Sequence, residues 1–143
     1  MPVDDPVAWV KNVERLYRAQ DAQAVSKLYA ADCRVRVGAT LLTPDEVHRH
    51  PYEWFGSLED YRIRRTFRAA YGDIIVSETT ASYVKKSVEV DAVGDDRYEA
   101  GRRYREFGVD VYWVNDAGRI YHKHVTETVE PDHGREPDEA DHE

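Results

Sequence analysis

Long hydrophobic runs and disulfide chemistry are both missing from this chain of 143 residues. No apolar run approaches the roughly 18 residues that a membrane-spanning helix needs, and the acidic N-terminus lacks the basic start of a signal peptide. The single cysteine, Cys33, excludes an internal disulfide and a cysteine-based metal cluster, so we expect it to fill space in the core. These absences predict a cytoplasmic protein with no membrane partner.

A basic surface is missing as well, because 28 acidic residues outnumber 20 lysines and arginines and give a net charge of −8. The arginines that could bind nucleic acid alternate with acidic residues in strand-like segments, so we expect an ion-paired or solvated face and no nucleic-acid partner. The arginines are Arg62, Arg64, Arg65, Arg68, Arg102, Arg103 and Arg105, and the acidic residues are Glu59, Asp60, Glu99 and Glu106.

The acidic excess is concentrated at the C-terminus. Residues 131–143, PDHGREPDEADHE, hold six carboxylates against one arginine and contain no aromatic or β-branched residue. Such a segment cannot offset its ordering entropy by burying apolar surface. We therefore predict a single domain over residues 1–130 and an acidic disordered tail over residues 131–143.

Three helices are predicted in the first part of the chain. Asp5 followed by Pro6 is a favourable helix start, and apolar residues then recur at helical spacing. A short second helix follows from Asp21, and Thr43 before a proline caps a third helix. Pro51 is expected to interrupt the third helix, which leaves the aromatic residues behind it on a separate turn or loop.

From about residue 61 onward the apolar pattern changes to a period of two, which predicts strands. Two turns, AYGD and NDAG, join the predicted strands into antiparallel hairpins. Helices followed by long strands predict an α+β fold in which the helices cover one face of a curved sheet. The strands are expected at residues 33–37, 61–69, 74–85, 98–114 and 119–129.

This order of elements, with the segments DAQAVSKLYAADCRVRV and GRRYREFGVDVYWVNDAGRIYHKHV, resembles the SnoaL-like branch of the nuclear-transport-factor-2-like superfamily over about residues 7–130. The resemblance implies a cone-shaped, curved antiparallel sheet with three N-terminal helices packed on its concave face. It also implies a pocket under the helices and a homodimer through the outer face of the sheet. Members of this superfamily include isomerases, dehydratases and other lyases, epoxide hydrolases, polyketide cyclases and non-catalytic proteins.

Family mechanisms match this sequence only in part. Asp110 falls where ketosteroid isomerase, a well-studied member of the superfamily, has the aspartic acid of its oxyanion hole. The catalytic base of that isomerase would fall on Val37 and its tyrosine near Val13, so its mechanism is contradicted. The limonene epoxide hydrolase pattern is not met either, because its last aspartate would fall on Val125.

The last hairpin, VDVYWVNDAGRIYHKHV, contains charged residues inside otherwise aromatic and β-branched strands. With Val114 opposite Arg119, the pocket face carries two opposing pairs, Asp110 with Lys123 and Tyr112 with Tyr121. The opposite face, suited to a dimer contact, then carries Val109, Val111, Trp113, Ile120, His122 and His124.

A one-residue bulge at Gly118 is the alternative register, and it would place His122 and His124 beside Asp110. The two histidines have a spacing seen in metal-binding strands, but no third ligand accompanies them, so we expect no metal. No glycine-rich phosphate loop is present, and we expect no cofactor.

The candidate catalytic residues are Asp110 as general acid or base, Lys123 as its electrostatic partner and Tyr112 as a hydrogen-bond donor. The candidate substrate-binding residues are Tyr17, Tyr52, Trp54 and Tyr121. A purely structural alternative stays open: Asp110 and Lys123 form a cross-strand ion pair worth up to about 1 kcal/mol, and the aromatic residues are core.

The sequence thus predicts a cofactor-independent enzyme of isomerase, cyclase or dehydratase type that transfers protons on an apolar small molecule. The alternative is a non-catalytic member that binds a ligand or serves as a dimerisation module. A cavity with an ionisable group pointing into it favours the enzyme.

Overall fold

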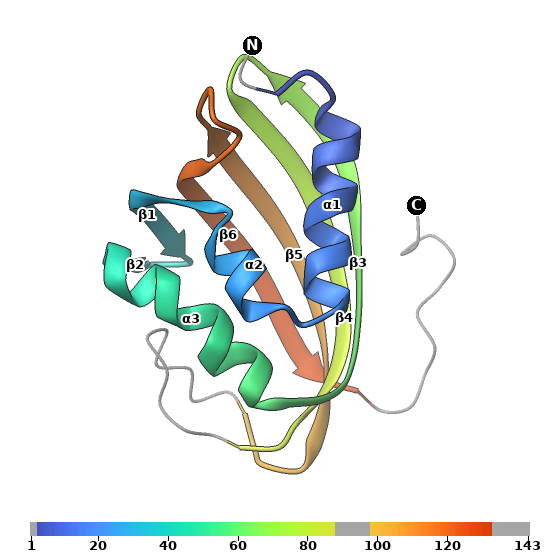
Figure 1. Cartoon of the computed structure of the whole chain (residues 1–143). Coiled ribbons are helices and arrows are strands. Elements are labelled where there is room, and N and C mark those ends of the chain that lie inside the picture. Colours follow the sequence, from blue (N-terminus) through green and yellow to red (C-terminus); the bar gives the residue numbers. More distant parts are fainter. Residues whose placement is uncertain (1–2, 88–97, 133–143) are drawn as a thin grey trace.

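A curved sheet carries three helices on its concave face, as the computed structural model of residues 3–87 and 98–132 shows (Figure 1). The tail prediction falls almost wholly on residues outside these ranges. None of the helices in the described ranges is long and apolar enough to cross a membrane. In chain order the elements are α1 (Pro6–Arg18), α2 (Ala22–Ser26), β1 (Tyr29–Val37), β2 (Thr40–Leu42), α3 (Pro44–Gly56), β3 (Leu58–Tyr71), β4 (Ile74–Lys85), β5 (Arg102–Val114) and β6 (Ile120–Pro131).

The strands lie in the order β2-β1-β6-β5-β4-β3. From β3 to β6 the chain forms an antiparallel meander, as the period-two pattern predicts. The sheet is nevertheless mixed, because β1 lies parallel to β6. No hairpin joins these two strands, and α3 carries the chain from one edge of the sheet to the other, so hairpin geometry does not set the direction of β1.

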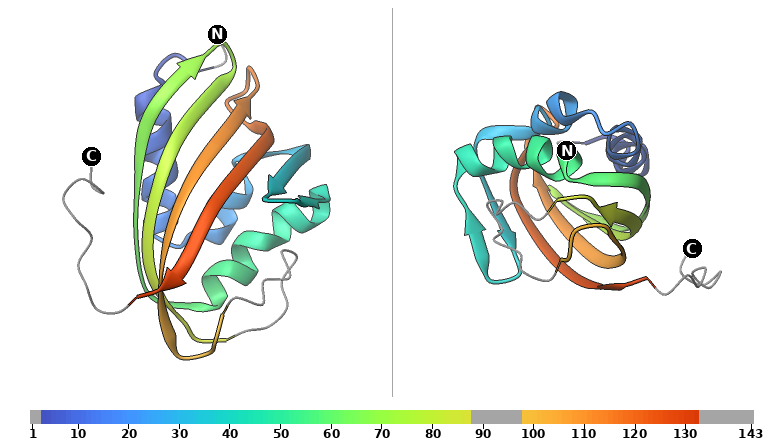
Figure 2. Two further views of the ribbon diagram at one scale, coloured as in Figure 1. Left: turned by 180° about the vertical axis from the view of Figure 1, so that it is seen from behind. Right: turned by 90° about the horizontal axis from the view of Figure 1, so that it is seen from below.

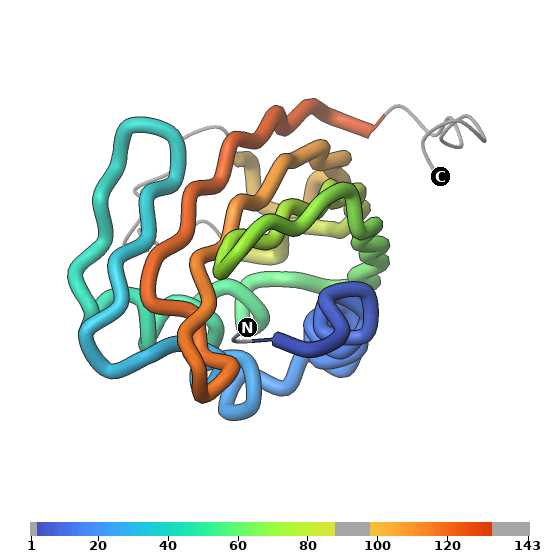
Figure 3. Tube along the Cα trace, turned by 90° about the horizontal axis from the view of Figure 1, so that it is seen from above, coloured from blue at the N-terminus to red at the C-terminus, as the bar shows by residue number. Residues whose placement is uncertain are grey.

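The predicted α+β class and cone-like curvature are confirmed. Seen from behind, the outer face of the sheet is free of helices, and seen along its axis the sheet curls around the side that the helices cover (Figures 2 and 3). Long strands twist and coil in this way because each strand has a right-handed twist. A cavity lies between the helices and the concave face of this curved sheet.

The first two helices begin where the sequence predicts. The side chains of Asp5 and Asp21 accept hydrogen bonds from backbone N–H groups three residues later, which satisfies donors that have no partner within the helix.

Farther along α1, two side chains reach the open edge of β3. Arg18 donates to the carbonyl of Ile63 at 3.0 Å, and Glu14 accepts from the backbone N–H of Arg65 at 2.6 Å. Helix α1 therefore both packs on the sheet and covers its edge.

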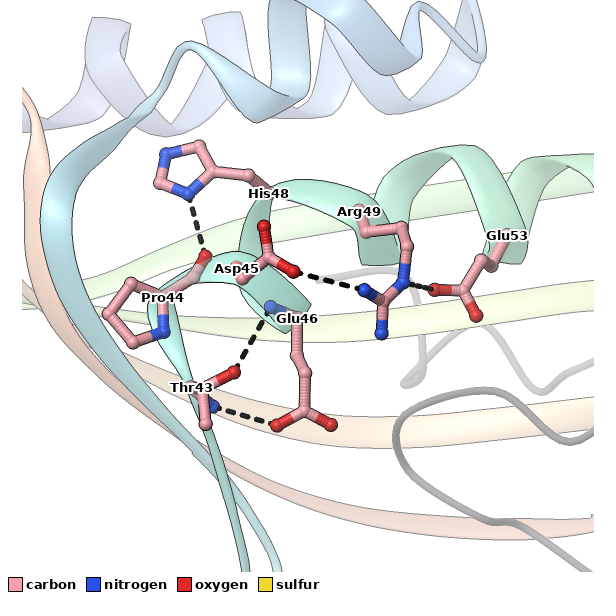
Figure 4. Close-up of polar contacts among 7 residues, drawn as sticks. All are labelled: Thr43, Pro44, Asp45, Glu46, His48, Arg49 and Glu53. Carbon is pink, nitrogen blue, oxygen red and sulfur yellow. Dashed lines mark hydrogen bonds and ion pairs between the residues drawn. The ribbon is translucent and has the colours of Figure 1, made fainter.

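Helix α3 is longer than the sequence suggested. It begins with a capping box between Thr43 and Glu46, and Arg49 binds one acidic residue a turn before it and another a turn after it (Figure 4). The predicted interruption at Pro51 is wrong, because the helix continues through this buried proline to Gly56. Trp54 is therefore held on a regular helix that packs against the sheet.

The register of the β5–β6 hairpin differs from the prediction by two residues. Asp110 lies opposite Val125, and Lys123 lies opposite Tyr112. Because side chains alternate with a period of two, a shift of two residues leaves all three polar side chains on the predicted concave face. The alternative register, with histidines beside Asp110, is also absent.

The turn between β5 and β6 explains why the register is shifted by two residues. Asn115 pairs with Arg119 across the turn, and the Asn115 side chain accepts from two backbone N–H groups inside it. A bulge at Tyr121 then turns this side chain outward and brings Ile120 into the core, the reverse of the prediction for both residues.

Two groups of buried side chains form the core under the helices. Cys33 is fully buried in the larger group, as predicted, and burial raises the pKa of its thiol to about 11. The larger group includes Val10, Val25, Val35, Val114 and Ile120, and the smaller one includes Leu58, Ile63, Tyr83, Tyr98 and Tyr104.

Candidate functional site

A cavity of about 100 Å³ lies between the helices and the concave face of the sheet. Its walls combine aromatic, ionisable and aliphatic side chains, which come from α1, α3, every strand of the sheet and the segment before β5. Besides aliphatic residues, the lining includes Tyr17, Tyr29, His50, Trp54, Tyr61, Arg65, Thr79, Tyr98, Glu106, Gly108, Asp110, Lys123 and Glu127.

A buried ion pair forms the floor of this cavity. Nη1 of Arg65 lies 2.7 Å from Oδ2 of Asp110, and each side chain is only 5% exposed. The same nitrogen also lies 2.7 Å from the Tyr112 hydroxyl and 3.1 Å from the Thr79 hydroxyl. Thr79 in turn donates to Oδ2 of Asp110 at 2.6 Å. Charge-assisted bonds of this kind fix the carboxylate and offset part of the cost of burying it.

The second carboxylate oxygen of Asp110 is free to act on a ligand. Oδ1 accepts no hydrogen bond from the part of the chain that the structure describes, although the side chain lines the cavity. Arg65 is held from two further sides. The Tyr17 ring lies 4.2 Å from its guanidinium carbon, and Glu14 binds its backbone N–H. The carboxylate is therefore oriented by contacts that leave one basic oxygen available.

Lys123 forms the adjacent wall. Its Nζ donates to the Tyr29 hydroxyl at 3.2 Å and lies 5.2 Å from the centre of the Tyr112 ring. Burial lowers the pKa of this ammonium group, but Tyr17, Tyr112 and Asp110 outweigh burial, and the pKa is raised above its ordinary value. Lys123 is thus a buried cation rather than a neutral nucleophile at neutral pH.

Glu106 provides a second carboxyl group on the same strand face as Asp110. Burial, followed by repulsion from Glu127 and Asp110, raises its pKa to about 8, despite a hydrogen bond at 3.2 Å from Tyr83. At neutral pH most of this carboxyl group is therefore protonated. One strand thus presents a carboxylate and a carboxylic acid to the same cavity, the arrangement from which acid and base roles can be assigned.

Gly108 separates these two carboxyl groups. A Cβ atom there would lie 3.4 Å from the backbone oxygen of Thr126 and 3.6 Å from Cβ of Glu127, so it would be in close van der Waals contact with β6. The cavity extends over this bare stretch of backbone. Four residues of strand separate the Cα atoms of Glu106 and Asp110 by roughly 13 Å.

The structure brings most of the predicted site together. Asp110, Lys123, Tyr17 and Trp54 line the cavity, and Tyr112 lies fully buried beside Arg65 in the cavity floor. The expected ion pair between Asp110 and Lys123 is absent from the described residues, and Arg65 occupies that place.

Two predicted substrate-binding residues lie elsewhere. Tyr52 is 52% exposed on the outside of α3, and Tyr121 is 37% exposed and bonded to Asp73. Neither lines the cavity. Tyr52 lies there because α3 continues through Pro51, and Tyr121 lies there because of the bulge in β6.

Arg65 and Glu106 are functional candidates that the sequence analysis missed. Both were assigned to a solvated or ion-paired face, yet Arg65 is 8% exposed and faces inward. The alternation of side chains along a strand could have revealed Glu106, because Glu106 and Asp110 differ by four positions and therefore point to the same face of the sheet. The prediction describes several other arginines correctly: Arg62, Arg68, Arg102 and Arg103 pair with acidic residues near the surface.

Comparison with known proteins identifies the fold. No protein-family model and no curated protein matches the sequence. Solved structures do match, and with them the chain has the SnoaL-like, nuclear-transport-factor-2-like fold that the sequence resemblance predicts.

Two of the similar structures are enzymes by description. One is SalBIII, an epoxide hydrolase/cyclase-like enzyme in pyran ring formation of the polyether salinomycin, with a TM-score of 0.68 and 14% identity over 88% of this chain and 95% of that chain. The other is an LEH-like epoxide hydrolase of M. tuberculosis, with a TM-score of 0.63 and 14% identity over 86% and 82% of the two chains. At this identity the likeness establishes the fold.

Proposed function

We propose that this protein is a cofactor-independent, cytoplasmic enzyme of isomerase, cyclase or dehydratase type, which transfers protons on a small, largely apolar molecule. One observation carries the proposal: Asp110, ion-paired through one oxygen with the other free, and Glu106, whose pKa burial raises to about 8, line one cavity on the same strand. A carboxylate and a carboxylic acid in one cavity can serve as base and acid at the same pH.

Asp110 is the base in this proposal. Its free Oδ1 takes a proton from a substrate carbon next to a carbonyl, or from a hydroxyl that attacks within the substrate. The electron pair moves toward a substrate oxygen, which receives the proton of Glu106. Arg65 and Thr79 hold the other oxygen of Asp110 and so fix the direction of the free one.

The similar structures support this choice of chemistry, because both are described as epoxide hydrolase or epoxide hydrolase/cyclase-like enzymes. Opening an epoxide ring also needs a base for the attacking O–H and an acid for the leaving oxygen. Asp110 and Glu106 supply those two roles. Cyclisation by a substrate hydroxyl is therefore the variant of the reaction that we favour.

We also propose that the protein is a homodimer through the outer face of the sheet, which the helices leave uncovered (Figure 2). Val109 is 41% exposed on this face. Farther along the same strand face, Trp113 packs against His122 and His124 at ring distances of 4.7 and 5.1 Å, and this cluster of rings is suited to a contact with a second copy.

The experiment that tests the catalytic proposal follows proton transfer directly. The protein is incubated in D₂O with a panel of cyclic ketones and of hydroxy-epoxides, and NMR records deuterium incorporation, ring closure and ring opening. We expect turnover of at least one compound by the wild type and by Glu59→Gln, an exposed control. Glu106→Gln should lower kcat at least about 100-fold, the lower end of the usual contribution of one acid/base group.

Asp110→Asn should abolish turnover, and its stability must be measured in parallel. The substitution leaves Arg65 buried without its carboxylate, and breaking a buried pair costs about 3–5 kcal/mol. Glu106→Gln keeps that pair intact and is therefore the decisive variant. If it retains full activity on a compound that the wild type converts, the acid role is refuted.

A further inference from the structure

Lys123 carries a buried charge with few partners. The residue is 6% exposed and lines the cavity, and an ammonium group can donate three hydrogen bonds. Within residues 3–87 and 98–132 it makes one hydrogen bond, to the Tyr29 hydroxyl, and no ion pair. The rings of Tyr29 and Tyr112, at 5.8 and 5.2 Å, and the charge of Asp110 stabilise this ion. Two of its three N–H groups nevertheless have no hydrogen-bond acceptor among the described residues, which points to a partner from outside the chain.

The nearby carboxyl groups do not supply that partner. Asp110 is bound to Arg65 and Thr79, and its strand register places it opposite Val125 rather than Lys123. Glu127 lies on the same strand as Lys123, four residues farther on, so about 13 Å separates their Cα atoms. The cationic wall of the cavity is thus distinct from its acidic end.

We propose that the cavity binds a small molecule through a carboxylate group, which Lys123 and Tyr29 hold at one wall of the site. Lys123 donates to one carboxylate oxygen. The Tyr29 hydroxyl, which already accepts from Lys123, turns its own hydrogen from Tyr17 to the other oxygen.

A monoanion fits this wall better than a phosphate. The ammonium group neutralises a single negative charge and the hydroxyl adds one hydrogen bond. A phosphate dianion calls for several cations or a row of backbone N–H groups. The remaining lining is aromatic and aliphatic, which suits an apolar body of about one ring. The ligand class is therefore a small aromatic or alicyclic carboxylic acid.

This inference rests on the proposed function for its catalytic meaning. In a sheet, diagonal neighbours such as Asp110 and Lys123 lie roughly 7–8 Å apart. A carboxylate at Lys123 would therefore place the first atoms of the ligand body over Oδ1 of Asp110. The far end of the molecule would point past Gly108 toward Glu106.

The test compares acids with their neutral amides. Benzoate, phenylacetate and cinnamate are titrated into the full chain by calorimetry at pH 6.5, each beside its primary amide. We expect at least one carboxylate to bind ten times or more tightly than its amide and to raise the thermal midpoint. If every carboxylate binds no better than its amide, the inference is overturned.

Matched variants assign the binding to Lys123. Lys123→Met keeps the chain length without the charge and should remove the preference for the acid, whereas Lys27→Met, an exposed lysine, should keep it. Tyr29→Phe should weaken the preference about threefold or more, and it serves as the second probe should Lys123→Met fail to fold. A preference that survives in both cavity variants refutes the assignment.

Binding and turnover can fail separately. Carboxylate binding that depends on Lys123 without any turnover in the D₂O assay would refute the catalytic proposal and leave this inference standing. Turnover that depends on Glu106, with no preference for acids over amides, would refute this inference and leave the catalytic proposal standing. Asp110→Asn, where it folds, should lose turnover yet bind the carboxylate at least as tightly, because it removes a nearby negative charge.

Discussion

The protonation of Glu106 makes a prediction about stability that needs no substrate. In the unfolded chain this carboxyl group loses its proton near pH 4.5, whereas in the folded protein burial and Glu127 raise its pKa to about 8. Between these two values the folded state binds a proton that the unfolded state has released. Stability therefore falls as the pH rises through this window, opposite to the usual behaviour of a salt-bridged carboxylate.

The size of the effect follows from the same values. Each pH unit across the window contributes about 1.4 kcal/mol, so a change from 4.5 to about 8 corresponds to at most about 5 kcal/mol. Glu106 is partly exposed, and solvent screening lowers this figure. We expect about 4 kcal/mol, which keeps the folded pKa above 7, and Glu106→Gln, which mimics the protonated acid, should gain that much over the wild type by pH 9.

Urea unfolding at half-unit steps from pH 5 to pH 9 measures the effect. The free energy of unfolding of Glu106→Gln minus that of the wild type should be near zero at pH 5 and rise toward pH 9. Glu59→Gln, with an exposed side chain, should give a difference that does not change with pH. A flat difference for Glu106→Gln, or a variant less stable than the wild type at pH 9, would mean that Glu106 is ionised at neutral pH.

Two further predictions concern the cavity floor and the outer face. Tyr112→Phe removes the hydroxyl that accepts from Arg65 at 2.7 Å, and it should lower the free energy of unfolding in urea by about 1–3 kcal/mol; no loss would mean that this bond is not formed. Val109→Glu should convert the dimer to a monomer in light scattering, while Leu41→Glu, at a position exposed to a similar extent, should not; a protein that is already monomeric would refute the dimer.

Local signals in the sequence predicted much of the fold. Asp5 and Asp21 cap the expected helices, and the period-two pattern from about residue 61 gives the long antiparallel strands. These features depend on contacts between residues close in the chain. The hairpin register was wrong by two residues because it depends on which backbone groups Asn115 binds in the turn, and a four-letter turn pattern does not specify that choice.

The candidate site was predictable only where one strand determined it. Parity along β5 and β6 placed Asp110, Tyr112 and Lys123 on one face, and a register error of two residues preserved that face. The ion pair between Asp110 and Arg65 could not be predicted in this way, because Arg65 lies 45 positions away on β3 and reaches Asp110 across β4. Such a pair depends on the order of three strands, which local patterns do not encode.

The contrast between Asp110 and Glu106 shows how the sheet can assign two roles to similar side chains. Both project from β5 into one cavity, so burial acts on both, and their different neighbours decide the outcome. Asp110 faces the guanidinium of Arg65, whereas Glu106 is close to the carboxyl group of Glu127. Burial is the first cause of the raised pKa of Glu106, and the negative charge of Glu127 adds to it. The acid and the base of the proposed reaction are thus determined by the side chains that β3 and β6 place beside them.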